Sequence, residues 1–303
     1  MSFVANVSTG AIRAGSSVMF ATYGEIISER AGIINLGVEG CMITGACTGF
    51  VVTAKTGEPY LGVLAAIASG ATLAAIHAFI VISRGANQLA SGLALMFLGL
   101  GLTAFVGRPY VSFKINGIND APIPLLSDLP GIGPVLFDHD PLTYLAFLLG
   151  PAIWWVVFKT RYGLQLRAVG ESVDAAFAAG LNPKRIQYMA VIAGGGLAGL
   201  GGAQLSLAYT QSWVEGMTNG RGFIAVALVI FAMWNPIRGM AGALLFGGAV
   251  AFQLQLQARG VGISPFLLDM TPYLLTIAVL LAWVRLGRDS FPAGLKEVFR
   301  GTG

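Results

Sequence analysis

The stretch ERAGIINLGVEG, residues 29–40, decides the fold of this chain, because it places polar side chains inside a run that otherwise suits a lipid bilayer. On a continuous helix Asn35 and Glu39 share one face, since they lie four residues apart. An ionisable side chain at the bilayer centre costs about 2.5–3.5 kcal/mol on insertion scales, so this face is expected to point to the protein interior or to water. The glycines of the stretch indicate a broken or closely packed backbone.

The composition places the chain among membrane proteins. Of its 303 residues, 55% are hydrophobic and only 11% are charged, and the mean hydropathy is +0.75. An ordinary soluble domain has about 25% charged residues, so this chain lacks the polar residues to cover so much apolar surface. The sequence therefore predicts an all-α, polytopic transmembrane helical bundle that forms one domain over residues 1–303.

Apolar runs long enough to cross a bilayer recur along the chain. A membrane helix needs about 20 apolar residues, and polar or Pro/Gly-rich breaks separate such runs here. We expect about nine spans, within a range of eight to ten, and we expect some to be broken or re-entrant because several runs are rich in glycine. The nine runs are residues 11–27, 31–54, 60–82, 88–107, 141–158, 186–209, 220–234, 240–257 and 270–286.

The distribution of Lys and Arg predicts the orientation. If the loop at residues 159–185 is cytoplasmic, alternation of the spans puts twelve of the eighteen Lys and Arg residues inside and six outside. This bias agrees with the positive-inside rule, so the N-terminus is expected outside and the C-terminus in the cytoplasm. The Pro- and Gly-rich loop at residues 108–140 then forms an extracytoplasmic cap.

The cytoplasmic loop, KTRYGLQLRAVGESVDAAFAAGLNPKR, carries an Ala-rich helical stretch at residues 171–179. Gly180 and Pro183 supply its stop signal. A short amphipathic helix between two spans suits a docking element. A basic loop that only sets the topology is equally compatible with the pattern, because basic loops are common at the ends of membrane helices.

Nothing in the sequence predicts a catalytic or metal site. His77 and His139 do not cluster with Cys or carboxylates at ligand spacing. No phosphate-binding Gly-rich loop leads into a Lys-Ser/Thr pair. The run AGGGLAGLGGAQLSLA indicates close helix packing instead, since Gly195 and Gly199 form a small-xxx-small face.

Several motifs together resemble one transporter family. GEIISERAGIINLGVEGCMITGA resembles the early segment of permease subunits from bacterial ABC importers for nucleosides and simple sugars, a superfamily that also includes ribose and branched-chain amino-acid permeases. KTRYGLQLRAVGESVDAAFAAGL resembles the family's cytoplasmic loop, and GGGLAGLGGAQLSL, GRGFIAVALVIFAMWNP and TPYLLTIAVLL match its later pieces in the same order. The resemblance covers nearly the whole chain. Gln88 replaces a usual acidic residue and Met96 a usual Asn, which leaves the substrate open.

The resemblance implies a transport subunit and not an enzyme. The implied partners are a cytoplasmic ATP-binding subunit that hydrolyses ATP, a second permease subunit, identical or different, and an extracytoplasmic solute-binding protein. The chain itself would bind no ATP or other cofactor, no metal and no nucleic acid, and it would be a multi-pass protein of the bacterial inner membrane. Residues 168–180 would be a coupling helix seated in the ATPase. Its contact surface would comprise Gly170, Glu171, Asp174, Ala175, Ala176 and Gly180.

Polar and aromatic side chains within the spans are candidates for the substrate pathway. A nucleoside or a related purine or simple sugar needs hydrogen-bonding groups for its hydroxyls and an apolar slot for a base. The candidates are Asn35, Glu39, Gln88, Phe97, Gln204 and Phe223. For Glu39, an interhelical hydrogen bond worth about 0.6 kcal/mol is an equally open interpretation.

Two other classes of function stay open from the residues alone. A stand-alone secondary transporter or channel would use Glu39 for ion coupling, although few carboxylates lie in the spans. A scaffold protein without a pathway would need Asn35 and Glu39 for stability only.

Overall fold

The computed structural model describes residues 3–260 together with 264, 267–268, 270–271, 274, 277–278, 281 and 292–295. Within these residues the fold is all-helical, which confirms the all-α part of the predicted fold class. The α-helices are α1 (Phe3–Arg30), α2 (Val38–Thr56), α3 (Pro59–Ala78), α4 (Gln88–Gly107), α5 (Gly133–Leu136), α6 (Pro141–Lys159), α7 (Arg161–Glu171), α8 (Val173–Ala178), α9 (Pro183–Ala203), α10 (Arg221–Phe231) and α11 (Pro236–Ala258). Shorter π and 3₁₀ segments are η1 (Phe79–Ser83), η2 (Arg108–Tyr110) and η3 (Gln204–Tyr209).

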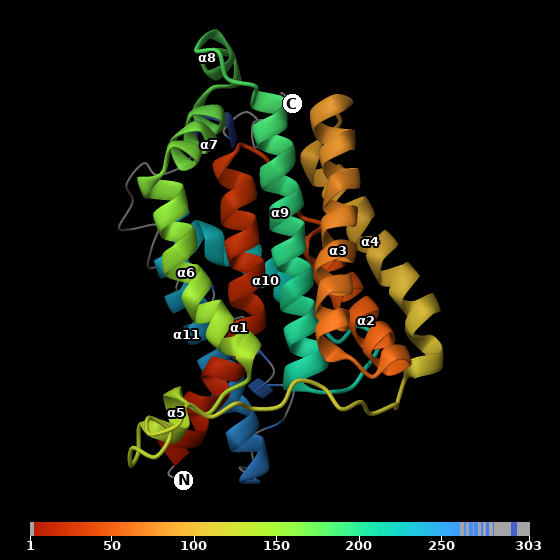
Figure 1. Ribbon diagram of the computed structural model, residues 1–303, viewed down its shortest axis with the longest axis vertical. Helices are drawn as coiled ribbons and strands as arrows, with labels where there is room; N and C mark the ends of the chain where they lie inside the picture. Colours follow the sequence, from red (N-terminus) through yellow and green to blue (C-terminus); the bar gives the residue numbers. More distant parts are fainter. Residues whose placement is uncertain are drawn as a thin grey trace.

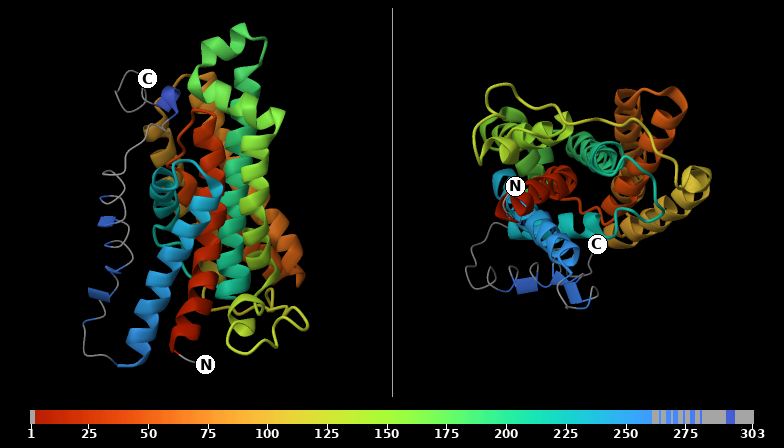
Figure 2. Two further views of the ribbon diagram at one scale, coloured as in Figure 1. Left: turned by 90° about the vertical axis from the view of Figure 1, so that its left-hand side faces the viewer. Right: turned by 90° about the horizontal axis from the view of Figure 1, so that it is seen from below.

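The long helices run side by side, and α9 lies near the middle of the bundle (Figure 1). It packs against α1, α2 and α3, while α4, α6 and α11 lie outside this group. The start of α1 and α5 lie at one end of the bundle, and α7 and α8 lie at the other (Figures 1 and 2). The loops at residues 108–140 and 159–185 therefore lie at opposite ends, as the predicted orientation requires.

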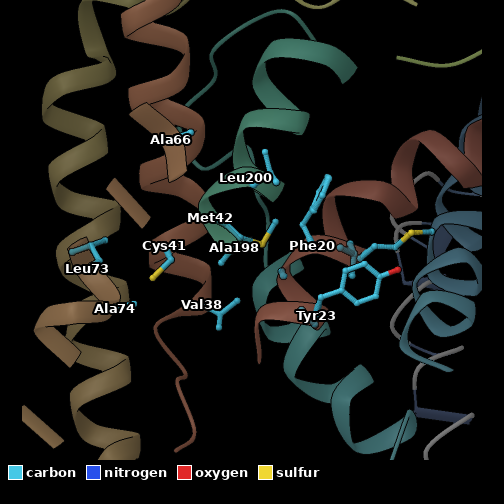
Figure 3. Packing of buried hydrophobic residues seen from close by; sticks show 14 of the residues in the cluster. Phe20, Tyr23, Val38, Cys41, Met42, Ala66, Leu73, Ala74, Ala198 and Leu200 are labelled. Carbon is cyan, nitrogen blue, oxygen red and sulfur yellow. The ribbon is translucent and has the colours of Figure 1, made fainter. Parts of the chain in front are cut away.

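Small residues allow α9 to lie close to its neighbours. Gly24 of α1 faces Gly194, and Gly45 of α2 faces Gly199, so closely that a Cβ on Gly24 or Gly45 would meet the backbone of α9. Gly195 and Gly199 lie against α3 in the same way, which confirms the predicted packing face. The surrounding buried side chains include Phe20 and Tyr23 of α1, Val38 and Met42 of α2, Leu73 of α3 and Leu200 of α9 (Figure 3).

Five helices in the described part of the chain are long and apolar enough to span a membrane: α3 with η1, α4 with η2, α6, α9 with η3, and α11. α1 and α2, with 28 and 19 residues, are long enough to span a membrane but are not among these five. They lie inside the bundle, where Glu25, Glu29 and Glu39 are buried in protein, so hydropathy alone does not identify them. The predicted span at residues 270–286 lies largely outside the described residues.

Two predicted spans differ from the observed helices. The span predicted at residues 31–54 becomes helical only at Val38, because residues 31–37 form a non-helical connection. The span predicted at residues 220–234 contains the eleven-residue α10. At 1.5 Å per residue this helix is about 16 Å long, too short to cross a hydrocarbon core of about 30 Å. Both differences fall on segments rich in glycine, which permits the backbone to leave the helical conformation.

Polar contacts tie the loop at residues 108–140, which is predicted to lie outside, to the bundle. Arg13 of α1 forms an ion pair with Asp120. His139 is 1% exposed, and its Nε2 donates a hydrogen bond to the carbonyl of Val135. Burial lowers the pKa of His139 below its ordinary value, although this hydrogen bond acts in the opposite direction. His139 is therefore packed within the folded loop.

We call residues 159–185 the inner loop, after the side of the membrane predicted for it. It forms two short helices, and the single helix predicted at residues 171–179 is wrong at its start. α7 ends at Glu171, and Ser172 has an extended conformation with φ −156° and ψ 115°. Its Oγ accepts a hydrogen bond of 3.2 Å from Ala175 N and so caps α8. The predicted stop is confirmed, because Gly180 has φ 81° in the left-handed region. Ser172 separates the two helices as a capping residue. The Ala-rich composition around it gives no sign of this separation.

Candidate functional site

The stretch ERAGIINLGVEG contains an interruption between the helices α1 and α2. α1 ends at Arg30, α2 begins at Val38, and the non-helical residues 31–37 are mostly buried. We call residues 31–37 the α1–α2 break. Asn35 lies in the break and not on a helix, so its predicted common face with Glu39 is wrong. Buried backbone polar groups have no water to bind, so protein groups must satisfy them.

Side chains of α1, α3 and α9 bind the carbonyl groups of the α1–α2 break. Each of three side chains donates a hydrogen bond to one carbonyl oxygen: His77 Nε2 to Ile34 O (3.0 Å), Gln187 Nε2 to Ala31 O (3.1 Å) and Ser28 Oγ to Ile33 O (2.8 Å). Because a carbonyl oxygen only accepts, His77 must carry a proton on Nε2. Its Nδ1 lies 3.0 Å from Ser91 Oγ, so α4 helps to orient the ring.

Side-chain oxygens likewise accept hydrogen bonds from the amide groups of the α1–α2 break: Glu25 Oε1 from Asn35 N (2.7 Å), Gln88 Oε1 from Ile34 N (2.8 Å) and Asn35 Oδ1 from Gly37 N (2.9 Å). Gln88 Nε2 also lies 3.4 Å from Gly32 O. The carboxamide of Gln88 thus both donates to and accepts from the break, which a carboxylate cannot do. This pairing gives a structural reason for Gln at a position where an acidic residue was expected.

Replacing Gln88 by leucine is expected to destabilise the α1–α2 break. Leucine leaves the buried N–H of Ile34 without its acceptor, which costs about 1–3 kcal/mol of unfolding free energy. Gln88→Glu keeps an acceptor and is expected to lose less. The measurement is the denaturation midpoint of the purified chain in detergent, with Gln165→Leu on α7 as the polarity control. Equal losses for Gln88→Leu and Gln165→Leu would contradict this role.

Glu39 holds the N-terminal end of the short helix α10. Its Oε1 accepts hydrogen bonds from Thr218 Oγ1 (2.6 Å) and Gly220 N (2.9 Å), and its Oε2 accepts one from Gly222 N (2.6 Å). The side chain is buried at the end of α10 where aligned peptide dipoles favour negative charge. A Cβ on Gly222 would lie 2.5 Å from Glu39 Cα, so this glycine permits the close approach. Glu39 thereby joins α2 to α10.

Glu29 and Arg30 hold the other end of α10. Glu29 Oε2 accepts a hydrogen bond of 2.6 Å from Trp234 Nε1. Arg30 donates from Nε to Trp234 O (3.3 Å) and from Nη2 to Met233 O (3.4 Å). Met233 and Trp234 have φ values of 49° and 55°, which are strained for side chains of this size. The stretch ERAGIINLGVEG therefore anchors α10 at both ends, through Glu29 and Glu39.

The structure separates the predicted pathway residues into two groups. Those at or beside the α1–α2 break are Asn35, Gln88 and Glu39. Gln204 is fully buried at the start of η3, and its Oε1 has no hydrogen-bond partner among the described residues. Phe97 is 66% exposed on α4, and Phe223 is 38% exposed in the first turn of α10. These three do not meet at the break.

The predicted coupling residues are also divided. Asp174, Ala175 and Gly180 are exposed on or next to α8, whereas Ala176 is buried against the molecule. Gly170 is buried too, and Glu171 is exposed and accepts a hydrogen bond from Ala293 N at 3.1 Å. An additional exposed residue is Phe177, at 71%, which the sequence analysis did not single out. The sequence signal that could have identified Phe177 is an aromatic residue within an Ala-rich run.

Sequence reasoning missed several side chains that hold the break and α10: Glu25, Ser28, His77, Gln187 and Trp234. Each is polar or carries a polar handle within or beside a span, and such residues in a membrane are expected to have partners. The partners come from distant parts of the chain, so the pattern marks the residues but does not pair them. No group of three or more His, Cys, Asp or Glu that suits a metal ion occurs in the described part of the chain.

Comparisons with known proteins agree on one class. The model of a family described as "Branched-chain amino acid transport system / permease component" matches residues 6–284. A putative glucose ABC transporter permease protein of Haloferax volcanii is 44% identical and covers 92% of this chain and 92% of that protein. A guanosine ABC transporter permease protein of Bacillus subtilis is 34% identical, covering 91% and 90%. A nucleoside ABC transporter permease protein of Lactococcus lactis is 34% identical, covering 87% and 87%.

Proposed function

Because the chain belongs to the branched-chain amino acid transport system / permease component family, we propose that it forms the membrane pathway of an ABC importer for a neutral nucleoside or simple sugar. The chain is an ABC transporter permease, a multi-pass membrane protein and a transport component rather than an enzyme, like the relatives described above. The resemblance seen in its motifs is thereby confirmed. In the proposed complex, ATP is bound and hydrolysed by a partner subunit.

Nine membrane crossings are proposed, all within one domain over residues 1–303. The crossings are α1, α2, α3, α4, α6, α9, α10 with the irregular segment before it, α11 and residues 270–286. This count puts the start of α1 and the cap at residues 108–140 outside, and α7 and α8 inside. It also puts the C-terminus in the cytoplasm, which is supported by the hydrogen bond from Ala293 N to Glu171 of α7.

The proposed substrate class rests on one observation: Glu39 already binds the amide groups at the N-terminus of α10. The N-terminus of a half-helix within a membrane attracts anionic groups of a substrate. Here Glu39 takes the amide groups of Gly220 and Gly222, so a phosphate or carboxylate finds those donors filled and meets a like charge. This favours a neutral solute, in line with the glucose, guanosine and nucleoside transporters among the relatives.

Uptake into proteoliposomes tests this function. The proposed complex contains this chain, a second permease subunit, the ATP-binding subunit and an extracytoplasmic solute-binding protein. It is expected to take up labelled guanosine or glucose only when ATP is supplied, and to exclude guanosine monophosphate and glucose 6-phosphate. Uptake by this chain alone, driven by an ion gradient, would instead support a secondary transporter that uses Glu39 for ion coupling. The three hydrogen bonds that Glu39 already accepts argue against that alternative.

The surface proposed to dock the ATP-binding subunit is α8 with its flanking residues. α8 lies at the end of the bundle that is proposed to face the cytoplasm, opposite the start of α1 (Figure 1). Phe177 is exposed there beside a pocket of about 270 Å³, which is also lined by Val173 and Leu181. An exposed aromatic residue next to an apolar pocket has the chemistry of an interface hot spot. Asp174 supplies a charge that a basic group on the partner would complement.

Replacing Phe177 by alanine is expected to lower ATP-dependent uptake by about tenfold or more, because losing a hot-spot aromatic costs about 2 kcal/mol of binding free energy. The double change Asp174→Arg and Ala175→Arg is expected to abolish uptake. The measurements are uptake and the amount of ATP-binding subunit that copurifies. The matched control is Phe105→Ala, which removes an 82% exposed ring from α4. If Phe177→Ala behaved like Phe105→Ala in both assays, α8 would not be the docking surface.

A further inference from the structure

The C-terminal residues 292–295 lie against the inner loop and contact α7 directly. Ala293 N donates a hydrogen bond of 3.1 Å to Glu171 Oε2 at the end of α7. A Cβ on Gly294 would lie 2.7 Å from Gly170 O, so the two backbones are nearly in contact. We call residues 292–295 the tail segment. It reaches α7 from a point in the sequence more than a hundred residues away.

Glycines bring the tail segment, α7 and the α1–α2 break to one junction. A Cβ on Gly170 would meet the carbonyl oxygen of Arg30, the last residue of α1. Gly32 has φ 84° and lies next to Gly170, so that a Cβ on Gly32 would be 3.5 Å from Gly170 Cα. Gly170 is thus placed between the break on one side and Gly294 on the other. Three backbones meet here because none of the three residues carries a side chain.

Leu295 extends the junction to α10. Its side chain is fully buried in a cluster separate from the main core. The other buried members of this cluster are Ile26 of α1, Ile34 of the α1–α2 break, Val229 of α10, and Ala232 and Trp234 after α10. Trp234 is the residue whose indole binds Glu29. The tail segment therefore contributes one side chain to the same buried cluster as the break and the end of α10 that carries Trp234.

A cavity lies next to the junction. It measures about 380 Å³ and is lined by Gln88 and Gln187, by Ser172 and Asp174 of the inner loop, and by Ala293. The cavity lies between the turn that joins α7 to α8 and the side chains that hold the break. Among the described residues, Gly170 meets the break directly beside this space, and Gly294 of the tail segment lies against Gly170.

We propose that Leu295 and the tail segment are positioning residues for transport, which join α7 to the α1–α2 break and to the inner end of α10. A displacement of α7 and α8 by the ATP-binding subunit is carried through Glu171 and Ala293 to Leu295. Leu295 then moves Ile34 and Trp234, which belong to the break and to the end of α10. The inference rests on the proposed function, because it concerns how ATP hydrolysis is coupled to the pathway.

The decisive measurement is the ratio of solute uptake to ATP hydrolysis in the complete complex in proteoliposomes, with labelled guanosine and glucose as probes. Leu295→Ala is expected to lower uptake by about tenfold while ATP hydrolysis stays within about twofold of the wild type, since coupling energies are commonly of that size. Leu295→Met keeps the volume and is expected to keep the ratio. The control is Leu274→Ala, at a side chain that is 54% exposed. Parallel loss of uptake and hydrolysis would show a merely structural role, and an unchanged ratio would show no role; either overturns the proposal.

A disulfide tests the junction independently of transport. In a full-length chain with Cys41→Ala and Cys47→Ala, the pair Glu171→Cys and Ala293→Cys is expected to crosslink under mild oxidation in membranes, whereas Glu171→Cys alone does not. Uptake by the crosslinked complex is expected to persist, because the tail segment stays joined to α7 throughout the cycle. Absence of the crosslink, or uptake blocked until a reductant is added, contradicts the proposal. A wild-type complex without ATP-dependent uptake would refute the proposed function, while the crosslink would still report on the junction.

Discussion

Replacing Glu39 by alanine is expected to unfold the centre of this protein and to abolish uptake. Alanine leaves the hydroxyl of Thr218 and the amides of Gly220 and Gly222 without their acceptor at membrane depth. Each such group costs about 1–3 kcal/mol, and a charge that favours the N-terminus of α10 is lost as well. The unfolding free energy is therefore expected to fall by about 3 kcal/mol or more. The measurement is denaturation of the purified chain in detergent, together with its yield in membranes.

Glu58→Ala is the matched control for Glu39→Ala, because Glu58 is exposed between α2 and α3 and makes no side-chain cap hydrogen bond there. It is expected to leave stability unchanged. Glu39→Gln keeps one acceptor oxygen but loses the charge, so an intermediate loss of stability is expected. If Glu39→Gln were as stable as the wild type yet inactive in uptake, Glu39 would act on the solute or on a coupling ion. That result would contradict its assignment as a helix anchor.

Replacing Gly199 by valine is expected to prevent the bundle from forming. A Cβ at this position would meet the backbone of α3 at Ala66 and would lie 3.3 Å from Gly70 Cα. On its other side α9 faces Gly45 of α2, so a shift of α9 away from α3 has little room. Overpacking typically costs about 1–3 kcal/mol, and backbone neighbours on two sides put this case at the upper end or above. The measurement is the fraction of monodisperse protein extracted from membranes and its thermal midpoint.

Gly101→Val provides the control for Gly199→Val. Gly101 also lies within a membrane helix, α4, but a Cβ there meets no described atom within 4 Å. Both variants add the same β-branched side chain to a helix, so any general cost of valine cancels in the comparison. A similar yield and thermal midpoint for the two variants would show that close approach of α9 to α3 is not required.

The sequence correctly predicted the helices that consist of one apolar run long enough to cross a bilayer. α4 occupies residues 88–107 as expected, and α6 and α11 lie close to their expected limits. The predicted helix limits were wrong where polar side chains inside the protein bind the backbone. The break at residues 31–37 and the shortness of α10 depend on hydrogen bonds from other helices, and local pattern does not report such bonds.

The candidate site shows the same division. The free-energy cost of polar groups in a bilayer identified Asn35 and Glu39 as residues that need protein partners. The structure supplies those partners. Phe97 was chosen for its chemistry alone and lies 66% exposed on α4. Phe177 and Leu295 were not chosen, because an exposed aromatic and a leucine in an apolar chain carry no local signal of their positions.

The sequence by itself determined that this chain is a multi-pass membrane protein and that the polar residues of ERAGIINLGVEG need protein or water around them. Those conclusions follow from the cost of placing charge and unpaired backbone in a bilayer, which is a property of each residue. The tertiary structure decided that Glu29 and Glu39 hold the two ends of α10 and that Gln88, His77 and Gln187 bind the backbone between them. A hydrogen bond needs two specific atoms within about 3 Å, and only the folded chain brings together residues so distant in sequence.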